Sequence, residues 1–209
     1  MEKLITRMKP VIIIFVSVFV FSQNLFAQDA VQLSLKNATE QYNQKKLLDA
    51  QKSLQSAVTE INNQIGQQVL DALPKTAGDL SADLESDMNG VPGGDLPCAS
   101  VNVSREYLGN DNSTLLLNIV SNTAAATNIK TAIDSWTPEN NPEQVQKIIY
   151  INERKALMTW DLESASGDIQ IAAGTTFLII SGDGFKDSDA FTAAAYKLDW
   201  SKALAILGQ

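Results

Sequence analysis

After the first 30 residues, apolar side chains recur along the chain at the spacing of an α-helix. Between residues 30 and 73 they return at intervals of three, four and seven, and the stretch contains no proline. The polar segment Asn43–Lys46 falls where this pattern changes phase, and Pro74 follows the last turn. The pattern therefore predicts two antiparallel helices joined near Asn43–Lys46, which form a helical hairpin over residues 28–74.

From Ala99 onward the pattern changes to the two-residue alternation of β-strands. Turn residues separate the apolar stretches, which predicts six strands, with a helix between the second and third and two helices at the end. The expected strands lie near 101–107, 113–121, 147–150, 156–162, 168–172 and 176–181, and the helices near 122–136, 190–198 and 200–207. We expect an α+β fold, in which a roughly six-stranded antiparallel sheet over 99–209 is covered by helices on one face.

The segment 75–98 differs in composition from both neighbours, because glycine, proline and acidic residues dominate it. It predicts an acidic Gly/Pro linker with at most one helical turn, over residues 80–84. The acidic residues lack the alternation and the later glutamate of a calcium-binding loop. We therefore expect a solvated linker and no metal site in this segment.

The first 27 residues have the pattern of a secretory signal peptide. Three cations precede an apolar core of 11 residues, Val11–Phe21, and a polar exit with small residues leads to cleavage between Ala27 and Gln28. The core is shorter than the ~20 residues that span a bilayer, which disfavours an uncleaved anchor. We expect export to the periplasm or the medium, with no membrane span after cleavage.

Charge and missing residue types exclude several functions. Residues 1–27 hold three of the 16 cations and one of the 24 acidic residues, so the remaining chain would carry a net charge of −10. This charge excludes nucleic acid as a partner, since binding to phosphates requires clustered cations. The chain contains no histidine and one cysteine, Cys98. Histidine-based nucleophilic catalysis, zinc sites and internal disulfides are therefore not expected.

Two arginines, Arg105 and Arg154, are the candidate contacts for an anion or a partner protein. Arg105 lies in the middle of a predicted strand, where a cation needs a carboxylate partner or an anionic ligand. The structural ion pair is the favoured interpretation and anion binding is the functional alternative. Two groups of carboxylates are further candidates. Asp183, Asp187 and Asp189 are candidates for loose cation binding, and we interpret them as a helix cap and surface residues. Asp161, Glu163 and Asp168 are candidates for an acid–base pair, and we interpret them as a solvated hairpin tip.

The predicted hairpin resembles one tetratricopeptide unit. Ala38, Ala50, Leu54 and Ala57 occupy the packing positions of that family, although Lys45 or Lys46 stands where the family has a turn glycine. No second unit is visible. The resemblance therefore implies the geometry of a helical hairpin rather than a peptide-binding array.

The C-terminal part, from Ile148–Trp160 through Phe177–Gly184 to Leu198–Leu204, resembles the end of a group of uncharacterised exported bacterial proteins. Those proteins combine a signal peptide, a helical hairpin and a small α+β domain. The sheet is more distantly similar to PsbP-like and Mog1-like domains. This resemblance implies the fold and the export, and it implies no catalytic residue and no cofactor.

These observations predict a non-catalytic exported module that binds a protein or an envelope component, without a cofactor or a metal. The alternative is a carboxylate-dependent hydrolase that acts on an envelope polymer. The lack of histidine and of known reaction motifs favours the binding module.

Overall fold

The computed structural model describes residues 30–90, 100–121, 123–138 and 141–209. The chain divides into two compact units between Gln64 and Ile65. The predicted signal peptide, its cleavage site at Ala27 and Gln28, and Cys98 lie outside the described residues.

The first unit is a helical hairpin, as the periodicity predicts. A helix over residues 30–43 is followed by a turn and by α2, Leu47–Ala72, whose last turns belong to the second unit. Small side chains make the contact between the helices, since Ala38, Ala50 and Ala57 are buried. Lys45 adopts a positive φ of 64° in the turn, at the position where the tetratricopeptide resemblance places a glycine.

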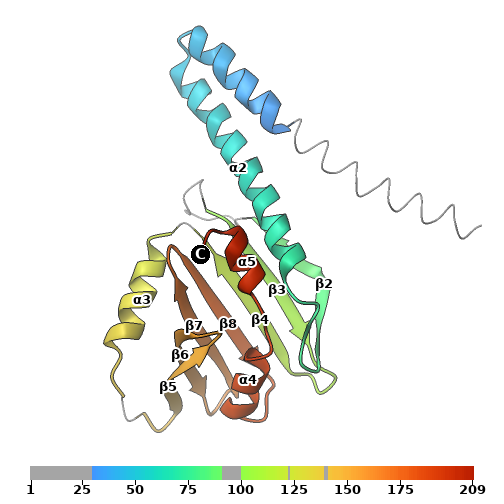
Figure 1. The fold of residues 1–209 in the computed structure, drawn as a ribbon, viewed down its shortest axis with the longest axis vertical. Coiled ribbons are helices and arrows are strands. Elements are labelled where there is room, and N and C mark those ends of the chain that lie inside the picture. The colour runs from blue at the N-terminus through green and yellow to red at the C-terminus, as the bar shows by residue number, and fades with distance from the viewer. Residues whose placement is uncertain (1–29, 91–99, 122, 139–140) are drawn as a thin grey trace, which may run out of the picture. The chain divides into compact units, whose positions relative to one another are not determined.

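The second unit contains one antiparallel sheet of eight strands, with three further helices (Figure 1). The strands are β1 Thr76–Ala77, β2 Leu80–Asn89, β3 Asn102–Leu108, β4 Thr114–Val120, β5 Gln144–Ile151, β6 Arg154–Asp161, β7 Ser166–Ala173 and β8 Thr176–Asp183, and the helices are α3 Ala125–Ser135, α4 Ser188–Ala195 and α5 Ser201–Ile206. Their order in the sheet is β1-β2-β3-β4-β8-β7-β6-β5. The last four strands form the predicted meander, and the pairing of β4 with β8 joins it to the first four.

One face of the sheet carries the main core. Leu115, Leu117 and Ile119 of β4 are fully buried, while Thr114, Leu116 and Asn118, which alternate with them, are half-buried. Helices α4 and α5 and the end of α2 contribute apolar side chains to this core. Gly182 of β8 is required there, because a Cβ atom at this position would lie 2.3 Å from the ring of Phe191 in α4.

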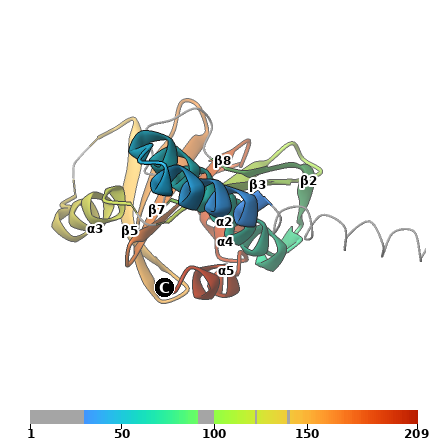
Figure 2. The ribbon, with the colours of Figure 1, turned by 90° about the horizontal axis from the view of Figure 1, so that it is seen from above.

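The opposite face is covered in part by α3, so the prediction that helices cover one face holds for α4 and α5 and fails for α3. Lys155 of β6 bonds Asp134 of α3 at 3.6 Å, and Lys155 alternates with the buried Ala156 of the core face. Figure 2 shows α3 lying apart from α4 and α5. The physical reason is that β8 carries apolar residues on both faces, and Phe177 and Ile179 need a cover of their own.

Two strands occupy most of the segment that was predicted to be an acidic linker. Leu80 is buried in the core and Ala82 packs against it, which holds β2 beside β3. The prediction of a linker over 75–98 was therefore wrong for residues 76–89, and the sheet has eight strands instead of six. β2 pairs on its outer side only with the two residues of β1, and acidic side chains are common on such exposed edges because they prevent further pairing.

The turn between β5 and β6 supplies a test of the local conformation. Asn152 and Glu153 have φ values of 47° and 64°, as in a type I′ turn, which favours Asn-Gly. We expect Glu153→Gly to raise the free energy of unfolding by about 0.5–1 kcal/mol, since glycine removes the steric cost of positive φ. Urea unfolding measures the change. Glu153→Ala removes the same charge without relieving the backbone, and an equal gain in that variant would contradict the explanation.

Candidate functional site

Arg105 is buried in the core face of β3, with 4% of its surface exposed. It stands between Val103 and Tyr107, which face the same core. Its Nε atom donates to Oδ1 of Asp87 at 2.8 Å, and its terminal nitrogen bonds the second carboxylate oxygen. Hydrogen bonding to Asp87 raises the pKa of Arg105 above its ordinary value. The guanidinium therefore stays charged and holds the carboxylate with two bonds.

The partner of Arg105 lies in a bulge of β2. The register of β2 against β3 shifts between Asp83 and Met88, so that several residues of β2 lie opposite Arg105. Arg105 also donates to the carbonyl oxygen of Leu73 at 3.2 Å, directly after the end of α2. A cation at this position stabilises the unpaired carbonyls of a helix end. Arg105 thus connects β3, the bulge and the end of α2.

Tyr107, two residues further along β3, also bonds a backbone carbonyl that follows the end of α2. Its hydroxyl donates to the carbonyl oxygen of Pro74 at 3.0 Å, and burial raises its pKa to about 12.

Arg154, the other candidate, begins β6 and is half-buried. Three strands separate β3 from β6 in the sheet, so the structure does not bring the two arginines together.

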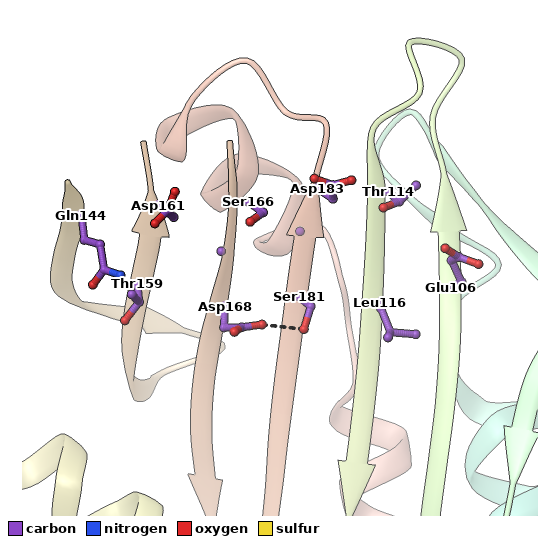
Figure 3. Close-up of a pocket in the computed structure, with 12 residues that line it drawn as sticks. Glu106, Thr114, Leu116, Gln144, Thr159, Asp161, Ser166, Asp168, Ser181 and Asp183 are labelled. Carbon is purple, nitrogen blue, oxygen red and sulfur yellow. Dashed lines mark hydrogen bonds between the residues drawn. The ribbon is translucent and has the colours of Figure 1, made fainter. Parts of the chain in front are cut away.

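A hollow of about 440 Å³ lies on the face of the sheet opposite the main core, and it is the best candidate site (Figure 3). Four strands supply its carboxylates: Glu106 from β3, Asp161 from β6, Asp168 from β7 and Asp183 from β8. Ser166, Ser181, Thr114, Thr159 and Gln144 add hydroxyl and amide groups. None of the described residues that line the hollow carries a positive charge.

Strand register explains why these side chains meet. In one row across the sheet, Glu106, Leu116, Ser181, Asp168 and Thr159 are successive cross-strand neighbours. In the next row, Thr114, Asp183, Ser166, Asp161 and Gln144 are neighbours in the same way. Since side chains directly opposite each other lie about 5 Å apart, the two rows form one continuous polar surface.

Two of the carboxylates are already bonded within the chain. Oδ1 of Asp168 accepts a hydrogen bond of 2.5 Å from the hydroxyl of Ser181, which fixes that side chain across β7 and β8. Asp161 accepts from the backbone amides of Ser164 and Glu163, and the bonds from Ser164 above all lower its pKa. Asp161 therefore remains ionised at neutral pH and adds a fixed negative charge to the edge of the hollow.

Further hollows lie in the same unit. One of about 310 Å³ shares Glu106 and Leu116 with the main hollow and extends it toward Met88 of β2, so the polar surface continues across the sheet. Another, of about 620 Å³, lies between α4 and two turns of the sheet and is lined mainly by small and apolar residues, including Leu80, Phe185 and Ala193. The main hollow offers more groups that can orient a polar ligand.

The remaining acidic candidates have structural roles or lie apart. Oδ1 of Asp187 accepts from the amide of Ala190 and caps α4, as predicted, while Asp189 bonds Lys147 at 3.1 Å. Among the described residues no group of three or more acidic or cysteine side chains is arranged to hold a metal ion. No helix in the described part of the chain has the length and apolar character needed to cross a membrane.

Comparisons of the chain with protein families, with curated proteins and with solved structures find no match. The resemblance to PsbP-like and Mog1-like sheets and to exported bacterial proteins stays a prediction.

The pair formed by Arg105 and Asp87 can be tested by stability. We expect Arg105→Met to lower the free energy of unfolding by about 3 kcal/mol, because it leaves the Asp87 carboxylate without its charged partner. Urea unfolding of Arg105→Met, Asp87→Asn and the double variant should show a loss in the double variant that is at least ~1 kcal/mol smaller than the sum of the single losses.

Arg154→Met is the matched control for that test. Arg154 is half-buried beside a turn, and we expect its replacement to change stability by less than ~0.5 kcal/mol. Unchanged unfolding of Arg105→Met, together with loss of ligand binding, would show instead that Arg105 serves a ligand.

Proposed function

We propose that the protein is a non-catalytic exported module that binds an amine-bearing envelope component, either a protein or a polymer, through the polar face of its sheet. The observation that carries the proposal is the hollow with Glu106, Asp161, Asp168 and Asp183, to which four strands contribute carboxylates without a cation among the described lining residues. Such a surface attracts positive charge.

The chemistry of the lining favours a ligand with protonated amines and hydroxyl or amide groups. Carboxylates accept charge-assisted hydrogen bonds from amines, and the serine, threonine and glutamine side chains both donate and accept. The adjoining hollow at Glu106 and Met88 supports an extended ligand. The absence of histidine from the sequence supports binding rather than acid–base catalysis.

Binding of two soluble probes tests this function. Oligolysine represents a basic protein segment and oligoglucosamine represents an amino-sugar polymer, and the two affinities, measured by calorimetry, distinguish the sources of the amine. We expect at least one probe to bind, and salt to weaken that binding, because exposed charges are screened. The double variant Asp168→Asn/Asp183→Asn should bind about ten-fold more weakly.

The control is a variant with the same change in charge outside the hollow. Glu85→Gln/Glu153→Gln removes two exposed carboxylates that do not line it. This variant should retain the affinity of the original protein. Equal losses in both variants would mean that only the overall charge of the protein matters, and no binding of either probe would reject the proposed ligand class.

A carboxylate-dependent hydrolase is the second candidate, and the grouping of Asp161, Asp168 and Asp183 in one hollow favours it. A hydrolase of this kind needs one carboxyl group that is protonated at the working pH. Asp161 does not fit that role, since its pKa is lowered. Release of reducing ends from oligoglucosamine would establish the hydrolase, and intact probe after prolonged incubation would reject it for that polymer.

We further propose that the protein is exported and that residues 1–27 are removed. The support is the charged start, the apolar core Val11–Phe21 and the small residue Ala27. Mass spectrometry of the exported product should give a chain that begins at Gln28. Ala27→Trp, which places a large side chain at the cleavage position, should slow this processing. A product that retains Met1 and stays in the membrane fraction would contradict cleavage.

A further inference from the structure

The helical hairpin exposes an apolar surface that its own fold does not cover. Eight of the 15 exposed large apolar residues of the described chain lie within residues 30–64: Leu33, Leu35, Tyr42, Leu47, Leu48, Leu54, Val58 and Ile61. The buried residues of the hairpin are alanines, so the contact between its helices leaves the large side chains outside. Clusters of exposed apolar side chains mark interaction surfaces.

The exposed residues of α2 form a regular stripe. Leu47, Leu54, Val58 and Ile61 are 61%, 50%, 37% and 42% exposed, and with Gln51 they follow one another at intervals of four and three residues. This alternation is the heptad spacing by which one helix packs against another in a coiled coil. The stripe therefore fits the side of another helix better than it fits a flat surface or a small ligand.

The distribution of charge indicates which helix packs against the stripe. Residues 30–64 contain four lysines and three acidic residues, a net charge of +1, whereas residues 65–209 contain nine cations and 19 acidic residues, a net charge of −10. Gln51 lies within the stripe and Leu48 and Gln55 flank it, and none of the three carries a charge that would oppose an identical stripe. The hairpin is thus the part of this acidic chain that can approach a second copy with the least charge repulsion.

We propose that the stripe Leu47–Ile61 binds the same stripe of a second copy of the chain, so that two hairpins form a four-helix bundle. The two α2 helices run antiparallel. This orientation separates their C-terminal ends, and therefore the chain that follows each of them and carries the charge of −10. The proposal is independent of the function assigned to the sheet.

The mass of the purified protein in solution, measured by light scattering, tests the proposal. We expect the mass of two chains for the original protein and of one chain for Leu54→Glu, which places a charge in the centre of the stripe. Ser56→Glu adds the same charge at an exposed position two residues away, off the stripe, and should remain a dimer. Circular dichroism of each variant shows whether the helices and the sheet stay folded.

The orientation has its own test. In a Cys98→Ser background, Ile61→Cys should give no disulfide between chains, because antiparallel stripes hold the two Ile61 positions far apart. A parallel pair would place them side by side and link them, which would overturn the antiparallel arrangement. A monomer at every concentration would overturn the proposal itself, as would a monomer that sediments with vesicles of anionic phospholipid.

Discussion

The ion pair between Arg105 and Asp87 is the constraint on which the N-terminal half of the sheet depends. A guanidinium in the middle of a core strand costs several kcal/mol unless its charge and its donors are matched. In this chain the carboxylate of Asp87, which lies in the bulge of β2, and the carbonyl oxygen of Leu73 accept the hydrogen bonds of the guanidinium. The last turn of α2, the irregular edge strand and β3 are therefore fixed relative to one another by one side chain, and Tyr107 adds a second bond of the same kind to Pro74.

The local pattern of apolar and polar residues predicted most of the fold. It failed where contacts between residues distant in sequence determine the structure. Helical spacing predicted the hairpin and the later helices, and alternation predicted six strands. The segment 75–98 was misjudged because its acidic residues are typical of loops, while its place in the sheet depends on Leu80 reaching a core made by distant residues. The second helix-covered face was missed for a related reason. The alternation along β8 places Phe177 and Ile179 on the face opposite Leu178 and Ile180, but it does not show that a helix covers that second apolar face.

The site was less accessible to sequence analysis than the fold. Arg105 was recognised as a strand-centred cation that needs a partner, but Asp87 stood in a segment taken for a linker. The carboxylates of the hollow come from positions as far apart as Glu106 and Asp183, and they meet only because β4 pairs with β8. The spacing of residues along the chain does not predict that β4 pairs with β8. Asp161 and Asp168 were noticed as neighbours, and their interpretation as a solvated hairpin tip omitted the strands on the other side.

The position of β8 has a consequence for biosynthesis. It is the last strand to leave the ribosome, yet it lies inside the sheet between β4 and β7. Until Thr176–Asp183 has emerged, β4 and β7 both have open edges, and the two halves of the sheet cannot join. The hydrogen bonds of β8 to both of its neighbours are therefore among the last of the sheet to form, whatever order the other strands follow.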